Sequence, residues 1–330
     1  MDYNEEEVFN IESAMSWYAE EINNLFSVLD FADKNKSSLQ YWQLSQAMAN
    51  YIKRAIPTWR VIEVYKKAVL YTIDFGNIEM LVSSLTELAL AHQEAGDFDQ
   101  ASVIFKDAEN LWRNPLNKES LAYVLNGYGF TLERLGKYEE ALKILDEALI
   151  VQDENQYGEA YTLNATGAVY WRMHKYDDAL NIFSTALKIR KKIKDYIGTA
   201  STINNMAFSH LKLGSTSIAK RMFFNSKKIF RKYHDRHGEA VVLNNLGYTS
   251  IELKNLKKAK NYATSARDIA VNIGDGYQIG RSFDVEGKAY LESGDKNRGI
   301  LLLQEALKIF IRLNVPEVKE IENIIGQINK

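Results

Sequence analysis

Asparagine recurs at one phase of the sequence, inside segments whose other residues predict helix. The four residues are Asn126, Asn164, Asn204 and Asn244, spaced by 38 to 40 positions. Asparagine is a mediocre helix former, so helix propensity does not explain its repetition. Its side-chain amide combines donors with an acceptor and therefore complements a peptide group. A row of such amides could hold an extended main chain whatever the side chains of that chain are.

Large aromatic and charged residues share a stripe with the asparagines. Residues three positions before each asparagine, and four and seven after it, lie on the same side of a helix, and in the fifth repeat Asp284 takes the place of the asparagine. The predicted peptide- or partner-binding residues are Tyr123, Asn126, Phe130, Tyr161, Asn164, Trp171, Asn204, Phe208, Asn244, Tyr248, Arg281 and Lys288. The aromatics would read the side chains of a bound segment. A structural role is the alternative, in which the asparagines bond to neighbouring helices and the aromatics pack between repeats.

Small residues in a fixed frame predict the helices that carry this stripe. One set recurs every 38 to 40 residues: Ala89, Gly129, Gly167, Ala207, Gly247 and Gly287. A second set follows twelve residues later: Ala101, Ala141, Ala179, Ala219, Ala259 and Gly299. A third set, which includes Ser226, follows seven residues after that. Close approach of two helices requires small residues where they cross. We expect the first two sets on an antiparallel pair, named helix A and helix B, and the third where helix B meets the next helix A.

Turn signals separate the expected helices. Between A and B a short turn precedes an aromatic residue, in GDF (Gly96–Phe98), GKY (Gly136–Tyr138) and HKY (His174–Tyr176). The links between units begin at Asn155, Asp195 and Asp235. Asparagine or aspartate at these positions can cap the helix that follows.

This frame resembles the tetratricopeptide repeat (TPR), whose usual period is about 34 residues. The longer period here predicts helices about one turn longer. The predicted fold is all-α, a right-handed superhelical TPR solenoid of antiparallel helix pairs with end-capping helices. The predicted parts are an N-terminal capping helix in 1–40, a degenerate TPR-like unit in 41–80 with Pro57 between its helices, six TPR units in 81–318, and a C-terminal capping helix in 316–330 opened by Pro316. No composition break divides the chain, so we expect one array.

Residue patterns for catalysis are absent from the sequence. It contains no cysteine, no phosphate-binding glycine loop and no nucleophile or zinc-protease motif. His234, His237 and Glu239 form a candidate surface metal site, but we favour their interpretation as polar residues of an inter-repeat turn. The sequence therefore predicts a protein that is not an enzyme and holds no cofactor or metal.

Charge is unevenly distributed, although the net charge is only −2. Residues 186–236 contain thirteen bases and two acids, whereas residues 1–34 contain nine acids and one base. Most of these bases lie on predicted B helices, the convex face of a TPR array. They indicate either a solvated face or a docking surface for an acidic partner. The isoelectric point near 6.3 and the lack of a nucleic-acid motif argue against nucleic acid.

No apolar run is long enough to span a membrane, and the acidic N-terminus does not resemble a signal peptide. We therefore expect a cytoplasmic protein without membrane contact.

Two further resemblances bear on function. Trp17, the stretch Ala19–Leu25 and Ala32 resemble the segment that opens the TPR arrays of bacterial STAND regulators. This chain contains no nucleotide-binding domain, so the resemblance implies no ATPase activity. The asparagine row resembles that of peptide-sensing TPR regulators of Gram-positive bacteria, although no helix-turn-helix is found. Together they imply a regulator or sensor that holds a peptide or extended protein segment in its concave groove. The alternative is a structural adaptor that bridges two proteins without a ligand-dependent switch.

Overall fold

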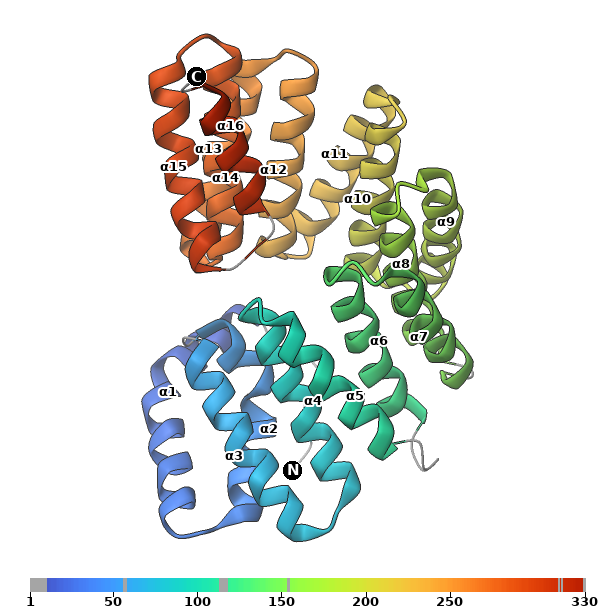
Figure 1. Ribbon diagram of the computed structural model, residues 1–330, viewed down its shortest axis with the longest axis vertical. Coiled ribbons are helices and arrows are strands. Elements are labelled where there is room, and N and C mark those ends of the chain that lie inside the picture. Colours follow the sequence, from blue (N-terminus) through green and yellow to red (C-terminus); the bar gives the residue numbers. More distant parts are fainter. Residues whose placement is uncertain are drawn as a thin grey trace, which may run out of the picture. The chain divides into compact units, whose positions relative to one another are not determined.

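The computed structural model describes residues 11–55, 58–112, 118–152, 155–313, 315 and 317–328. Within these ranges the chain forms sixteen α-helices and no β-strand. The chain divides into two compact units, Met1–Asn114 and Pro115–Lys330 (Figure 1). The predicted roles of Pro57 and Pro316 lie outside the described residues.

Unit one contains five helices: α1 (Ile11–Lys34), α2 (Ser38–Ala55), α3 (Thr58–Phe75), α4 (Ile78–Glu94) and α5 (Phe98–Trp112). The predicted N-terminal amphipathic helix is α1, which buries Phe26 and Leu29 in a core shared with α2 and α3. At the other end of that core, Asp33 accepts hydrogen bonds from Lys67 Nζ at 2.6 Å and from Tyr71 Oη at 2.5 Å. These bonds tie the end of α1 to α3.

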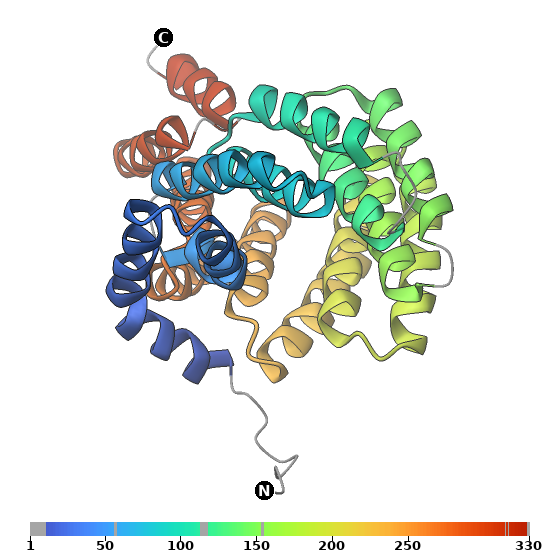
Figure 2. The ribbon, with the colours of Figure 1, turned by 90° about the horizontal axis from the view of Figure 1, so that it is seen from below.

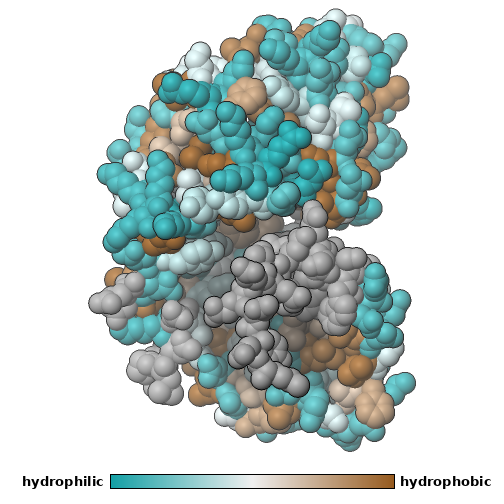
Figure 3. All heavy atoms as spheres, turned by 180° about the vertical axis from the view of Figure 1, so that it is seen from behind, coloured by the Kyte–Doolittle hydropathy of each residue, from teal (hydrophilic) through white to brown (hydrophobic). Residues whose placement is uncertain are grey.

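Unit two consists of five helix pairs and a terminal helix. The pairs are α6 (Lys118–Arg134) with α7 (Tyr138–Val151), α8 (Gln156–Arg172) with α9 (Tyr176–Lys192), α10 (Tyr196–Lys212) with α11 (Thr216–Lys232), α12 (Arg236–Glu252) with α13 (Leu256–Asn272), and α14 (Gly276–Glu292) with α15 (Lys296–Arg312). The terminal helix is α16 (Glu317–Ile328). They follow one another in a curved row (Figure 1, Figure 2). Hydrophilic side chains cover much of the visible surface of this unit (Figure 3).

Small residues lie where the helices of a pair cross, as predicted. A Cβ atom added to Gly287 on α14 would lie 3.1 Å from the main-chain oxygen of Gly299 on α15. Ala179 and Ala219 are fully buried at the corresponding positions of α9 and α11. In the third set, Ser226 Oγ donates to the Ala200 carbonyl at 2.7 Å, a bond that the sequence did not predict. Ala200 lies on α10, the helix A of the same pair. This helix approaches α11 closely enough for a direct hydrogen bond between the two.

Turns and caps also follow the sequence signals. Gly96 and Gly136 adopt positive φ values of 77° and 75° directly after their A helices, a conformation that glycine tolerates best. Asp195 and Asp235 cap α10 and α12, because each Oδ1 accepts from a main-chain N–H three residues later at 2.8 Å. The capping prediction is confirmed at these positions.

One undivided array is not what the structure shows. The first predicted TPR unit, α4 with α5, belongs to unit one, and the remaining five belong to unit two. The division falls at Asn114 and Pro115, outside the described residues. None of the described helices combines the length and apolar character that a bilayer crossing requires.

Candidate functional site

The predicted stripe lies on the inner side of the curved row in unit two. Successive A helices contact one another, α6 with α8, α8 with α10, α10 with α12 and α12 with α14. Within the described ranges, an A helix separates each B helix from the next. An array whose A helices approach each other more closely than its B helices must curve toward the A helices. The A helices therefore line the concave side.

The asparagines of the stripe bond to the next A helix. Asn126 Oδ1 accepts from Thr162 Oγ1 at 2.9 Å, and Asn164 Oδ1 accepts from Thr202 Oγ1 at 3.2 Å. Asn204 Oδ1 accepts from Asn245 Nδ2 at 2.7 Å. We name these bonds, together with those of Asn244, the asparagine ladder.

Asn244 has the most complete set of partners in the ladder. Its Nδ2 donates to the main-chain and side-chain oxygens of Gln278, both at 3.1 Å, and its Oδ1 accepts from Ser282 Oγ at 3.1 Å. The residue is 0% exposed, and Asn126 and Asn204 are also buried. The amides of Asn204 and Asn244 bond to a neighbouring helix, because the A helices lie within hydrogen-bonding distance of each other. This arrangement matches the structural role that was the alternative to peptide binding.

Asn164 differs from the other three asparagines. It is partly exposed, and among the described residues only its Oδ1 has hydrogen-bond partners. Its Nδ2 group is therefore a donor at the groove surface.

Aromatic side chains on the stripe are exposed at its N-terminal end. Tyr123 and Phe130 on α6 are 54% and 46% exposed, and Tyr161 on α8 is 53% exposed. Trp171 and Phe208 are partly buried, with ring centroids 6.0 Å apart in an edge-on arrangement. The stripe therefore combines solvent-facing aromatics with aromatics that pack between repeats.

Charged side chains gather at the C-terminal end of the stripe. Tyr248 Oη donates to Asp284 Oδ2 at 2.5 Å, and Lys288 Nζ donates to Asp284 at 2.9 Å and to Glu320 of α16 at 2.7 Å. Arg281 Nη2 donates to Asn245 Oδ1 at 2.9 Å. Burial raises the pKa of the Asp284 carboxyl, although Lys288 and Tyr248 oppose the shift. For Lys288, burial would lower the pKa, but Asp284 and Glu320 outweigh it and the pKa is raised.

Sequence reasoning missed the partners of the ladder. Thr162, Thr202 and Ser282 are hydroxyl residues of one frame, each near the start of an A helix. Asn245 is the second residue of an Asn-Asn pair. The recurrence of hydroxyl residues at this phase could have predicted these partners, since each hydroxyl can bond to the preceding repeat.

Other candidate sites contain none of the predicted binding residues. His237 Nδ1 lies 2.7 Å from Asp275 Oδ2, an ion-pair geometry between α12 and the cap of α14. In the part of the chain that the structure describes, no group of three or more histidine, aspartate or glutamate side chains is placed to hold a metal. A cavity of about 310 Å³ in unit one is lined by Phe26, Asp30, Tyr41 and other residues of α1 to α3.

Comparison with known families identifies the repeat. The family model described as "Tetratricopeptide repeat" matches residues 120–192, which span α6 to α9. The match covers two of the predicted repeats, the helix pairs α6 with α7 and α8 with α9. No curated protein matches this chain.

Solved structures with the TPR fold resemble this chain along most of its length. The signal transduction ATPase with numerous domains from Pyrococcus horikoshii, which has a tetratricopeptide repeat sensor, is 16% identical with a TM-score of 0.58, over 93% of this chain and 50% of that one. A Rap protein complexed with Competence and Sporulation Factor is 11% identical with a TM-score of 0.59, over 94% and 98%. The APC/C hetero-tetramer Cut9-Hcn1 is 15% identical with a TM-score of 0.59, over 94% of this chain and 53% of that one. The predicted all-α TPR solenoid is confirmed, and at these identities the likeness shows the fold alone.

Proposed function

We propose that the concave side of unit two holds a peptide or an extended segment of a partner protein, and that the chain acts as a non-catalytic regulator or sensor module. The observation that carries this proposal is the exposure of Tyr123, Phe130 and Tyr161 on two consecutive A helices. Aromatic rings offer large rigid contact areas at a low entropic cost, so exposed aromatics in a concavity favour ligand binding.

The asparagines have divided roles in this proposal. Asn126, Asn204 and Asn244 hold the A helices in register beneath the groove surface through their buried bonds. Asn164, with its Nδ2 donor at the surface, contacts a carbonyl of the bound segment. Trp171 and Phe208 support the surface from below, while Tyr248, Arg281 and Lys288 form a charged end of the groove.

A regulator role is supported by the kinds of proteins that share the fold. The Rap structure contains Competence and Sporulation Factor, and the STAND protein has a tetratricopeptide repeat sensor. The assembly subunits of the Cut9-Hcn1 structure instead support the alternative, a structural adaptor. Small-angle scattering separates the two functions, because a sensor is expected to change its radius of gyration when its peptide binds, whereas an adaptor keeps its shape while holding two proteins.

The groove is tested with peptides selected from a displayed random library on the full chain. A triple variant, Tyr123→Ala, Phe130→Ala and Tyr161→Ala, is expected to weaken the selected peptides roughly tenfold or more, because buried aromatic anchors dominate such interfaces. The control is Ile150→Ala on α7, which removes a 78% exposed apolar side chain from a B helix. Equal affinities of the triple variant and the control would show that the peptides bind elsewhere.

A further inference from the structure

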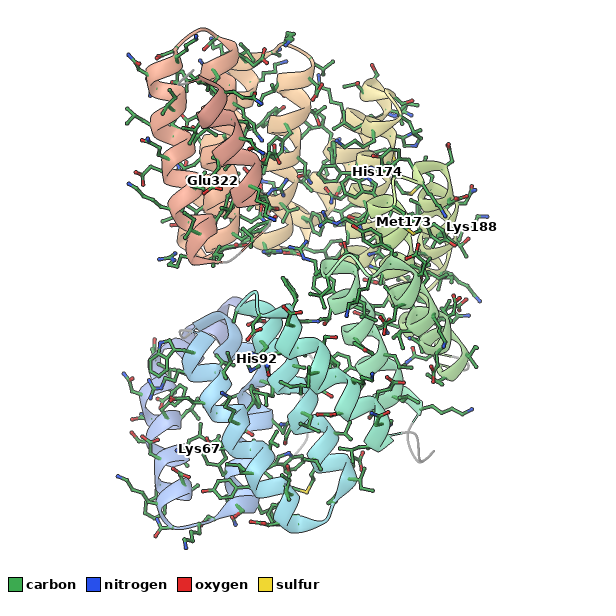
Figure 4. All side chains as sticks on the ribbon, in the orientation of Figure 1. Lys67, His92, Met173, His174, Lys188 and Glu322 are labelled. Atoms are coloured by element: carbon green, nitrogen blue, oxygen red, sulfur yellow. The ribbon has the colours of Figure 1, made fainter. Side chains whose placement is uncertain are left out.

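Basic side chains occupy the same register on two consecutive B helices of unit two. The set on α9 is Lys188, Lys191 and Lys192, and the set forty residues later on α11 is Lys228, Arg231 and Lys232. All six are exposed, and Figure 4 labels Lys188 on the outer side of α9. Since the B helices of a TPR array run parallel, the ends of α9 and α11 lie at one edge of the unit. We name these six residues the basic edge.

Carboxylates do not neutralise most of this charge. Arg231 lies 3.7 Å from Glu239, but among the described residues no carboxylate oxygen lies within 4.0 Å of the five lysine amino groups. The two acids of the segment 186–236 are Asp195 and Asp235, whose Oδ1 atoms cap α10 and α12. Asp195 also pairs with the buried Arg190 at 3.5 Å. Both acids therefore serve the fold, and the lysines remain available to a partner.

An aromatic pair lies beside the two basic rows. Tyr196 at the start of α10 stacks on Tyr233 at the end of α11, with ring centroids 4.8 Å apart and planes inclined by 10°. Tyr196 is 47% exposed, and the amino group of Lys232 lies 5.3 Å from the Tyr233 ring. The edge thus offers an apolar surface next to positive charge, which suits a segment that mixes acidic and apolar side chains.

The two adjacent repeats do not continue the positive rows of the basic edge, and bases return at this register in α15, at Lys308 and Arg312. In α13 the equivalent positions are Asp268 and Val271, and in α7 the position equivalent to Lys188 is Ile150. A nucleic acid strand would extend over these neighbouring repeats, which do not continue the positive rows. The short length of the basic edge therefore favours a short acidic protein segment.

We propose that the basic edge is a second binding surface, which docks an acidic segment of a partner protein at the edge of unit two where α9 and α11 end. Carboxylates of the segment face the lysines of α9 and α11, and an apolar side chain lies against the pair Tyr196 and Tyr233. Helix-dipole stabilisation explains bases in the last turn of each helix. It explains neither Lys188 and Lys228, which lie a turn earlier, nor the exposed aromatic beside them.

The test uses the full chain and two fluorescein-labelled peptides, one rich in glutamate with a central tyrosine and the other with glutamine in place of each glutamate. The glutamate peptide is expected to bind and the glutamine peptide is not. Binding should weaken roughly tenfold from low to physiological ionic strength, because exposed charges are screened. The double variant Lys192→Glu and Lys232→Glu should weaken it at least tenfold further.

The matched control is Lys257→Glu with Lys258→Glu on α13, which makes the same change in net charge at two exposed lysines away from the edge. The control is expected to bind the glutamate peptide within about twofold of the unmodified chain. Equal losses in the two double variants would overturn the proposal in favour of diffuse net charge. Tighter binding of a single-stranded DNA oligonucleotide than of the glutamate peptide at the same ionic strength would overturn it in favour of nucleic acid, and failure of the glutamate peptide to bind would also overturn it.

Discussion

Asn244 shows at the residue scale how one amide can hold two repeats together. All three of its hydrogen bonds go to α14, and truncation would remove the donor that the buried Gln278 Oε1 accepts from, whereas Ser282 Oγ would keep its bond to the Gln278 carbonyl. We expect Asn244→Ala to lower the free energy of unfolding by about 1–3 kcal/mol in urea denaturation. Asn225→Ala on α11 is the control, because that side chain is exposed and should change stability by less than about 0.5 kcal/mol. An unchanged midpoint for Asn244→Ala would mean that the ladder contributes little.

Tyr71 provides a pH-dependent test in unit one. Its hydrogen bond to Asp33, together with burial, raises the pKa of the phenol from 10.0 to about 12. A phenol whose pKa is higher in the folded state stabilises the fold fully below pH 10, and the contribution is lost as the pH rises from about 10 to about 12. Asp33 has a pKa lowered by its hydrogen bonds to Lys67 and Tyr71, so its own contribution is lost as the pH falls below about 4.

We therefore expect Tyr71→Phe to cost about 0.5–1.5 kcal/mol at neutral pH and to reduce the alkaline loss of stability relative to the unmodified chain. Chemical denaturation at a series of pH values measures both effects. Tyr157→Phe is the control for the substitution itself, because its ring is exposed on α8. Parallel stability curves for Tyr71→Phe and the unmodified chain above pH 10 would refute the role assigned to the bond with Asp33.

Ala179 tests the packing of a whole element, the crossing of α8 and α9. Its side chain is fully buried where the two helices approach each other. Leucine there would force the helices apart, and we expect Ala179→Leu to cost roughly 1–3 kcal/mol. Asn181→Leu on the exposed face of the same helix is the control and should be neutral or slightly stabilising. Equal melting temperatures of the two variants would mean that the small-residue frame does not mark the crossings.

The sequence predicts helices better than the contacts between them. The frame of Ala179 and Gly287 was readable because close helix crossing admits few residue types. Helical spacing also predicts the face of the helix on which Asn244 lies. Its partners were not predicted, because they depend on the separation of α12 and α14, which no local pattern determines. For the same reason the hydrogen bond from Ser226 to the Ala200 carbonyl of its own pair was not predicted.

Two compact units predict separable folding at the scale of the whole molecule. Contacts within a TPR array are made mainly between neighbouring helices, so five pairs with a terminal helix can bury a core of their own. We expect a fragment of residues 115–330 to be helical by circular dichroism and to melt cooperatively. A control fragment that begins instead at residue 138, and so lacks α6, should lose stability, because it exposes a surface of α8 that α6 covers. An unfolded 115–330 fragment would show that unit two requires unit one.

The asparagine ladder also determines how unit two can bend. Direct hydrogen bonds fix the separations between A helices, whereas successive B helices are held apart by the helix between them. Such an array has its hinge line along the inner side, so a change in curvature alters chiefly the spacing of the B helices. If a segment bound in the groove changed this curvature, the distance between Lys192 and Lys232 would change with it. A segment that spans both lysine rows would bind tightly at one curvature and weakly at another, although it would contact the same residues in both.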